Sequence, residues 1–368
     1  MEKAKRSPLR TALKFIGCVI GLVILLAAAA FCVLLACEYK PADTEGVEIV
    51  GQGSKTLSAG DTFTMLTWNI GYGALGDNAD FFMDGGTKVY TADESRVQKN
   101  VSAIIGFISD AAPDIIYLQE TDRSSDRSYR NDEAALISGS FPGYTAAFAN
   151  NLKSLFIPYP IPPIGKTDSG LLTLNSYTAD SAQRIQLPIP FKWPVSAFNL
   201  KRCLLIERVP VENSDSELVL VNLHLEAYDD GEGKIAQAKM LKEIMDQELD
   251  KGNYVIVGGD FNQVFSNTDT SAYPLYPDKW TPGTLNADEF TEQGWQLVTD
   301  SSVPTCRSLD RAYADADKSD FQYYVIDGFI VSPNITVESC VTADLDFANS
   351  DHNPVTLTVT LSDTQARS

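Results

Sequence analysis

The chain has 368 residues, of which 44% are hydrophobic and 10% aromatic, which is enough apolar material for one large domain or two ordinary ones. Its formal net charge of −20 disfavours tight non-specific binding to duplex nucleic acid, because an acidic surface repels a polyanion and the sequence has no offsetting basic stripe. The six cysteines include no CxxC pair, so they indicate neither a zinc site nor a disulfide framework and leave open one bridge between Cys306 and Cys340.

The N-terminal part of the chain predicts a membrane segment. Residues 1–14 are rich in lysine and arginine, and residues 15–37 are apolar without a charge. As a helix, this apolar run would span about 34 Å, enough to cross a hydrocarbon core of about 30 Å. Acidic residues follow it. The positive-inside rule therefore predicts a cytoplasmic basic tail at 1–14, a transmembrane segment at 15–37 and the rest of the chain outside.

Three interpretations of this segment compete. An uncleaved signal anchor is favoured, because the apolar run exceeds the roughly 7–15 residues of a cleavable signal. Residues 34–37 also resemble a bacterial lipoprotein box, which would be cleaved before Cys37 and lipidated on that residue. A cleaved secretory signal is the third interpretation. Each places the functional domain outside the cytoplasm, and the first two hold it at the plasma membrane, as a single-pass protein or a lipoprotein.

Residues 38–60 are polar, contain glycine and lack periodicity, so they predict an extracytoplasmic linker. Residues 61–362 then predict one domain. Two amphipathic helices are expected at 93–109 and 233–249. Short runs rich in β-branched and aromatic residues predict strands, at 62–68, 114–119, 170–174, 203–209, 217–223, 254–257, 323–331, 335–341 and 355–361. The expected strands outnumber the expected helices, and helices lie between some of the strands. This order indicates stacked sheets covered by helices.

Short polar strings follow several of these strands, and the only two histidines of the chain lie in two of them. The strings are WNIG at 68–71, LQE at 118–120, NLHL at 222–225, GGDFN at 258–262 and SDHNP at 350–354. Histidine has an unperturbed pKa near neutrality, which suits it to proton transfer. Carboxylate and amide oxygens without thiolates are hard ligands that favour Mg²⁺, Mn²⁺ or Ca²⁺ over zinc. Together these groups predict hydrolysis of a phosphate ester.

With IDGF at 326–329, these strings resemble the endonuclease/exonuclease/phosphatase superfamily over about residues 60–362. This superfamily has the deoxyribonuclease I-like fold and includes sphingomyelinases and inositol polyphosphate 5-phosphatases. The resemblance implies an α+β fold, a four-layer α/β/β/α sandwich of two mixed sheets, preceded here by one transmembrane helix. The chain would be a membrane-anchored bacterial member, and its NLHL string is more similar to the deoxyribonuclease I and sphingomyelinase branches than to exonuclease III.

The resemblance also implies a metal site. Glu120 would be the principal ligand of Mg²⁺, with Mn²⁺ or Ca²⁺ as alternatives. Asn69 would contact the metal or the phosphate beside it, and Asp351 would assist the metal or align the site.

Five further residues would perform the catalysis in this interpretation. Asp260 would orient or deprotonate the attacking water, and Asn262 would bind the phosphate. His224 and His352 would contact the phosphoryl oxygens or transfer a proton, and Asp327 would orient one of the histidines. The two histidines are expected on facing sheets, on either side of the scissile phosphate.

The substrate is less constrained. Asn222, Lys166 and Arg202 are expected to contact it. Residues 151–165 and 191–194 are apolar and proline-rich, and they either dip into a bilayer beside the anchor or pack as rigid buried loops. A phospholipid headgroup or a small phosphoester fits the acidity better than duplex DNA does. An endonuclease acting on extracellular nucleic acid and a non-catalytic binding module are the alternatives, and no protein partner is indicated.

Overall fold

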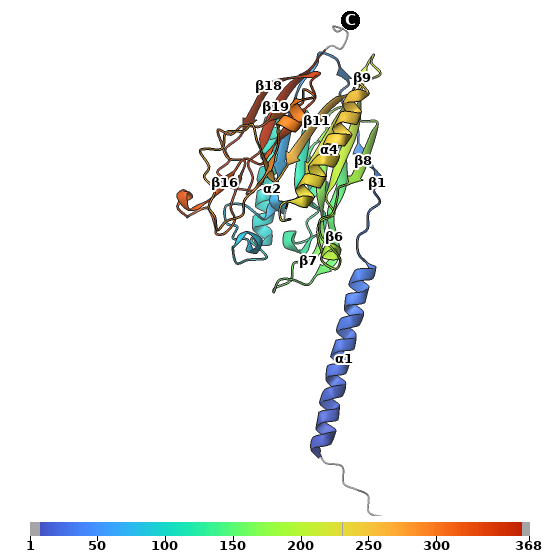
Figure 1. Ribbon diagram of the computed structural model, residues 1–368, viewed down its shortest axis with the longest axis vertical. Helices are drawn as coiled ribbons and strands as arrows, with labels where there is room; N and C mark the ends of the chain where they lie inside the picture. Colours follow the sequence, from blue (N-terminus) through green and yellow to red (C-terminus); the bar gives the residue numbers. More distant parts are fainter. Residues whose placement is uncertain (1–7, 230, 363–368) are drawn as a thin grey trace, which may run out of the picture.

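The computed structural model describes residues 8–229 and 231–362. It opens with the long helix α1 (Pro8–Ala36), which projects from one end of the remaining chain (Figure 1). No residue of α1 is buried, and it alone among the described helices is long and apolar enough to cross a membrane, a property that an N-terminal signal sequence shares. The helix begins at Pro8, so residues 8–14 of the expected basic tail are helical, and residues 1–7 of that tail lie outside the described residues.

Two large mixed sheets form the centre of the domain. The first has eight strands in the order β1-β8-β9-β10-β11-β17-β14, with β3 paired to β9. Its strands are β1 (Thr44–Val47), β3 (Leu57–Ser58), β8 (Ser181–Gln186), β9 (Cys203–Glu212), β10 (Glu217–His224), β11 (Tyr254–Asp260), β14 (Gln296–Val298) and β17 (Asp327–Val331).

The second sheet has seven strands in the order β18-β19-β4-β5-β7-β6-β2. They are β2 (Ile49–Gly51), β4 (Thr62–Asn69), β5 (Ile115–Asp122), β6 (Thr145–Ile157), β7 (Gly165–Asn175), β18 (Ile335–Thr342) and β19 (Val355–Leu361). Two small ribbons complete the strands, β12 (Gln263–Phe265) with β13 (Gly283–Leu285), and β15 (Cys306–Arg307) with β16 (Tyr323–Tyr324). Each large sheet contains a central parallel pair, β4 with β5 and β10 with β11.

Helices cover the outer faces of both sheets (Figure 1). They are α2 (Glu94–Ala111) and α3 (Glu133–Ser140) on the second sheet, and α4 (Glu232–Asp250) and the short α5 (Asp288–Thr291) on the first. Single-turn helices lie in the connections: η1 (Gly71–Gly73), η2 (Phe82–Asp84), η3 (Asp126–Ser128), η4 (Val195–Phe198) and η5 (Lys318–Asp320). Asp93 begins α2 by accepting a hydrogen bond from Arg96 N at 2.8 Å, which satisfies one of the free amides of the first turn.

Three apolar layers separate these elements, so the expected α/β/β/α sandwich is confirmed. Tyr117 and Leu220 belong to the layer between the sheets. Alternate residues of the same strands face outward, because successive side chains of a strand point to opposite faces. Thus Leu118 packs with α2, and Val219 packs with α4.

The expected linker at residues 38–60 is wrong for most of its length. Strand β1 pairs with β8 at the edge of the first sheet, β2 pairs with β6 at the edge of the second, and β3 pairs with β9. Val47 and Ile49 pack on the core beneath these edges. Edge strands this short take their stability from the sheet they join, which explains why the segment shows no periodicity of its own. Cys306 and Cys340 are free thiols, so the bridge left open between them is not formed.

Candidate active site

A cavity lies at the edge where β4, β5, β10 and β11 end. Eight of the residues predicted from the sequence line it: Asn69, Glu120, Arg202, His224, Asp260, Asn262, Asp351 and His352. Asp327 lies directly behind this lining, bonded to His352. The strings that are dispersed over the sequence therefore meet in one place, because the carboxyl ends of neighbouring parallel strands share an edge of their sheet.

Strand register aligns the catalytic groups of the first sheet. His224 is opposite Asp260 in the parallel pair β10–β11, and Asp260 is opposite Asp327 in the antiparallel pair β11–β17. Side chains opposite one another in neighbouring strands are only about 4.5–5.5 Å apart at Cβ. Three adjacent strands thus present three functional side chains in one row.

A β-bulge aims Glu120 into the cavity. The pairing of β5 with β7 shifts between Leu118 and Thr121, and Glu120 has a φ of 53° within this irregularity. A left-handed backbone conformation is strained for a residue other than glycine, and such strain collects at functional sites. The bulge turns the Glu120 side chain away from the buried alternation of β5 and toward Asn69, which ends the neighbouring strand β4.

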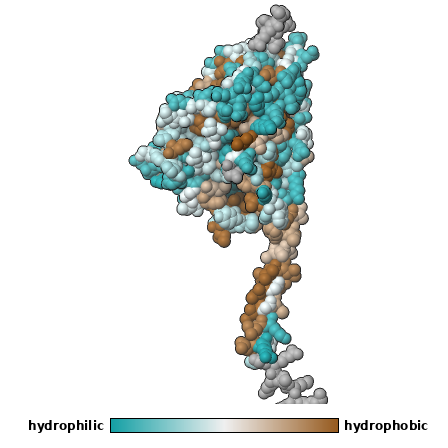
Figure 2. Space-filling model, viewed as in Figure 1, coloured by the Kyte–Doolittle hydropathy of each residue, from teal (hydrophilic) through white to brown (hydrophobic). Residues whose placement is uncertain are grey.

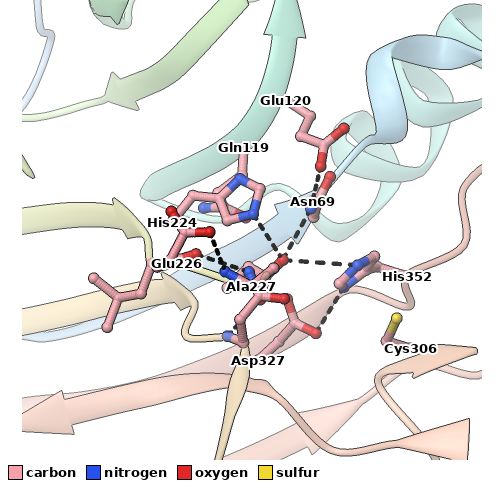
Figure 3. Close-up of polar contacts among 12 residues, drawn as sticks. Asn69, Gln119, Glu120, His224, Glu226, Ala227, Cys306, Asp327 and His352 are labelled. Atoms are coloured by element: carbon pink, nitrogen blue, oxygen red, sulfur yellow. Dashed lines mark hydrogen bonds and ion pairs between the residues drawn. The ribbon is translucent and has the colours of Figure 1, made fainter. Parts of the chain in front are cut away.

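The two histidines approach one carboxylate oxygen from opposite sides (Figure 3). Asp260 Oδ2 lies 3.4 Å from Nε2 of His224 and 3.7 Å from Nε2 of His352. His224 ends a strand of the first sheet, whereas His352 lies outside the large sheets, in the connection that leads into β19 of the second. Burial, together with the neighbouring Asp327, raises the pKa of Asp260 to about 7.

The histidines differ in charge. Burial lowers the pKa of His224 well below its usual value, and the positive charge of Arg202 lowers it further, so this imidazole is neutral. Burial also opposes the charged form of His352, but Asp327 outweighs it and raises the His352 pKa well above its usual value. His352 Nδ1 donates to Asp327 Oδ2 at 2.9 Å, as expected for an orienting carboxylate. His352 is therefore an imidazolium at neutral pH.

The metal-binding residues expected from the sequence are suited to a hard divalent cation. Asn69 Nδ2 donates to Glu120 Oε1 at 3.3 Å and to Asp260 Oδ2 at 3.0 Å, so one amide connects two carboxylates. Burial raises the pKa of Asp351 to about 7, and the negative charge of Glu120 contributes to this rise. Among the described residues, neither Glu120 nor Asp351 has an ion-pair partner within 4.0 Å. Carboxylate oxygens without a cationic partner are donors that Mg²⁺ prefers. The Asn69 Oδ1 atom accepts from Gly71 N at 3.0 Å.

Two further groups bring possible ligand atoms within 4.8 Å of one another, and both contain His352. Asp260, Asp327 and His352 form the first, but its atoms are already engaged in the hydrogen bond and ion pairs described above. Cys306, Asp351 and His352 form the second. Burial raises the pKa of the Cys306 thiol to about 12, so it is a neutral and poor ligand for a hard cation.

Two expected substrate contacts, Asn222 and Lys166, are not among the residues that line the cavity. Asn222 is fully buried one pleat below His224, where its Oδ1 accepts from Gln119 Nε2 at 2.9 Å and its Nδ2 donates to Leu172 O at 3.1 Å. It joins the two sheets rather than lining the cavity, because residues two apart on one strand face the same way at different depths. Lys166 lies outside the cavity lining, and its Nζ donates to Ser124 Oγ at 2.8 Å.

Arg202, the third expected substrate contact, does line the cavity. Its Nη1 donates to His224 O at 3.1 Å, and its Nε lies 3.3 Å from Glu226 Oε2. It therefore supports the histidine and supplies positive charge at once.

Sequence reasoning missed several polar residues of the lining, among them two arginines, a tyrosine and an aspartate. Arg127 is held by Asp122 at 3.0 Å, and Arg307 donates to two backbone carbonyls. Tyr228 donates to Asp84 at 3.3 Å, and burial raises the pKa of Asp84 to about 6. None of these residues lies in a string with a second polar group of the site, and only the tertiary fold brings them to the cavity.

A comparison with protein families matches this arrangement. The model described as Endonuclease/Exonuclease/phosphatase family matches residues 66–352, a range that includes every residue of the site described above. The chain belongs to this family. Its members are hydrolases that act on phosphoester bonds, so the activity class expected from the strings at the strand ends is supported at that level.

Solved structures show the same fold. An endonuclease/exonuclease/phosphatase from Beutenbergia cavernae is 19% identical, with a TM-score of 0.57 over 82% of this chain and 72% of that one. A Bacteroides vulgatus family member is 16% identical, with a TM-score of 0.53 over 82% and 100% of the two chains. The human nocturnin catalytic domain with bound sulfate is 16% identical, with a TM-score of 0.50 over 86% and 98%. No curated protein matches the chain.

Proposed function

We propose that this protein is a membrane-anchored phosphodiesterase that requires a divalent cation and acts outside the cytoplasm. The observation that carries the proposal is the position of Asp260 between a neutral and a positively charged histidine, beside the unpaired Glu120 and Asp351. Phosphoester hydrolysis needs a group that accepts a proton from water, a group that stabilises the phosphoryl oxygens and a site for the neutralising cation. The cavity supplies all three.

Each residue has a distinct role in this reaction. Asp260, whose pKa is raised toward neutrality, accepts the proton of the attacking water. The His352 imidazolium, held by Asp327, donates a hydrogen bond to a phosphoryl oxygen, and neutral His224 orients the water or the phosphate from the other side. Asn262 lies in the lining with its side-chain amide held by Leu225 O at 2.9 Å, ready to contact the phosphate.

Glu120 and Asp351 would hold the divalent cation, and Asn69 would orient Glu120 through its side-chain amide. Bound there, Mg²⁺ would neutralise charge on the phosphate and lower the barrier for displacement of the leaving oxygen. Charged groups of both signs line the cavity: Asp84, Glu120, Asp260 and Asp351, with Arg127, Arg202, Arg307 and His352. The cationic groups offset the carboxylates, so the cavity can accept an anionic ester.

The membrane placement rests on α1 and its contacts with the domain. The ring of Phe31 lies 6.4 Å from that of Phe198, and Glu38 forms an ion pair with Lys201 at 3.2 Å. Glu38 follows Cys37 and would be present in either form, so only the Phe31 contact belongs to the helix. We favour an uncleaved anchor over a lipoprotein attached through Cys37, because the apolar run is longer than that of a cleavable signal. The mass of the mature chain distinguishes them, and antibody labelling of intact cells tests whether the domain lies outside.

A substrate panel tests the activity. The full chain should hydrolyse bis-nitrophenyl phosphate with Mg²⁺, Mn²⁺ or Ca²⁺ and lose this activity in chelator. Glu120→Gln should weaken metal binding measured by calorimetry and lower the rate by about 100-fold or more. Glu243→Gln, which changes an exposed glutamate of α4, is the matched control. Full activity in chelator would contradict the metal requirement, and absence of hydrolysis with every ester and metal would favour a binding module.

A further inference from the structure

Two segments at one end of the domain differ in charge from the rest of the chain. Residues 151–166 and 187–202 contain no aspartate or glutamate, although the chain as a whole has a net charge of −20. Their charged residues are all basic: Lys153, Lys166, Lys192, Lys201 and Arg202. The first segment forms the hairpin between β6 and β7, and the second connects β8 to β9 through η4. We refer to these two segments together as the basic end.

The basic end carries large apolar side chains that face solvent. Ile161 is 95% exposed, Tyr159 73%, Trp193 62% and Val195 55%. Hydrophobic side chains are visible at the projecting hairpin tip in Figure 2. The expectation that these proline-rich segments are buried loops is therefore wrong at their tips, where no neighbouring element of the described chain covers them. Exposed apolar clusters on soluble surfaces mark sites of association with a partner or a membrane.

The basic end is also the end to which α1 is attached. Phe198 contacts Phe31 near the end of α1, and Lys201 pairs with Glu38 just beyond it. Figure 1 shows the β6–β7 hairpin projecting on the side of α1, with its tip level with the last turns of that helix. A membrane crossed by α1 would therefore meet the hairpin tip.

The roots of both segments form part of the active-site wall. Asn151 and Leu152 line the cavity from the first segment, and Leu200 and Arg202 line it from the second. Lys201 N donates to Asn151 O at 2.6 Å, which joins the two roots. The exposed tips and the cavity are thus two ends of the same pair of segments.

We infer that the basic end docks on the outer leaflet of the membrane that α1 spans, and that the substrate is a phosphodiester carried by a lipid of that leaflet. This inference rests on the proposed function. Tryptophan and tyrosine favour the boundary between headgroups and acyl chains, and isoleucine favours the acyl side. Three of the basic residues are engaged within the domain, Lys153 with Asp168, Lys201 with Glu38 and Arg202 with Glu226. Lys192 is exposed beside Trp193 and has no ion-pair partner among the described residues, so it can bind an anionic headgroup. Exposed aromatic and aliphatic tips beside a lysine favour a lipid surface over a protein or a nucleic acid.

Docking is tested first without any use of activity. Trp68 and Trp295 are buried, Trp280 belongs to the cavity lining, and Trp193 is the exposed tryptophan of the described chain. In vesicles of phosphatidylethanolamine and phosphatidylglycerol with brominated acyl chains, fluorescence of the full-length protein should be quenched. Trp193→Phe should remove most of this quenching. If the wild-type protein shows no quenching beyond that of Trp193→Phe, docking is excluded.

Substrate presentation is tested with the double variant Ile161→Ser with Trp193→Ser. Release of water-soluble headgroup from the same lipids, unbrominated, should fall by about tenfold or more, while hydrolysis of bis-nitrophenyl phosphate stays within about twofold. Val341→Ser is the matched control, because Val341 is 55% exposed on β18, at the opposite edge of the second sheet from β6 and β2. It should leave both activities unchanged.

The outcomes separate this inference from the proposed function. If the protein hydrolyses the soluble ester but releases no headgroup from vesicle lipid, the lipid substrate is excluded and the phosphodiesterase function stands. The same holds if naked DNA is the only other substrate that it cleaves. Equal lipid turnover by the double variant and the wild type overturns the role of the basic end. Quenching of Trp193 without hydrolysis of any ester supports docking and overturns the proposed function, and with it the lipid phosphodiester as substrate.

Discussion

His352 Nδ1 lies 2.9 Å from Asp327 Oδ2, and this contact gives the two histidines of the chain different charges. His224 has no comparable orienting carboxylate on its second ring nitrogen among the described contacts, and burial keeps it neutral. One site thus contains an imidazole and an imidazolium on either side of Asp260, at the same pH. The difference can be measured directly, because the chain has only two histidines.

Nuclear magnetic resonance of the imidazole nitrogens should show one neutral and one protonated histidine near pH 7, with metal removed. Asp327→Asn should lower the pKa of His352, because its main stabilising charge is lost. Since a positive His352 is required, the alkaline limb of the rate profile should move to lower pH and kcat should fall by about 100-fold. Two neutral histidines in the wild type would contradict this assignment.

Arg202 and Lys166 should differ sharply in their effect on catalysis. Arg202→Lys keeps the charge but loses the fork that holds both His224 O and Glu226, so kcat/KM should fall by about tenfold. Lys166→Met should stay within about twofold of the wild type, because Lys166 lies outside the cavity and bonds to Ser124. Steady-state kinetics with bis-nitrophenyl phosphate measures both. Equal losses would mean that Lys166 reaches the substrate after all.

Asn222→Ala should reduce stability rather than substrate affinity. The substitution leaves one N–H of the buried Gln119 amide without an acceptor, while the other still donates to Thr67, and an unsatisfied buried donor costs about 1–3 kcal/mol. The corresponding decrease in melting temperature is roughly 2–4 °C per kcal/mol for a domain of this size. Thermal melts in detergent and the KM for a soluble ester give the two readouts. A raised KM with an unchanged melting temperature would assign Asn222 to substrate binding.

Glu207 should make the domain less stable at alkaline pH. It is buried between the sheets, and burial raises its pKa from 4.5 to about 8. Between these values the folded protein keeps a proton that the unfolded chain releases. The stabilisation is therefore complete below about pH 4.5 and is lost as the pH rises through about 8, with a slope approaching about 1.4 kcal/mol per pH unit.

Glu207→Gln removes this titration. The melting temperature of the variant should fall less than that of the wild type between about pH 6 and pH 9. Glu243→Gln, at an exposed position, should melt with the wild-type pH dependence. Parallel curves for Glu207→Gln and the wild type would show that Glu207 is ionised in the folded protein.

The sequence predicts the site better than it predicts the edges of the fold. Asn69, His224 and Asp260 end strands with strong local patterns, and neighbouring strands bring their ends together. Arg127 and Arg307 reach the cavity only through contacts made after folding, so no spacing along the chain indicates them. Asn222 could not be placed for a different reason. The alternation of polar and apolar residues along a strand shows which face of the sheet a side chain lies on, but it does not show how deep between the sheets the side chain lies.

The pairing of β1 and β2 with different sheets has a consequence for how the domain can be isolated. Only Glu48 separates the two strands, so the segment that leads away from α1 also closes an outer edge of each sheet. A soluble fragment begun near residue 61 would expose the backbone of β8 and β6, and open edges invite pairing between molecules. The smallest self-contained unit begins at Thr44, and a fragment cut later should self-associate even though its catalytic residues are all present.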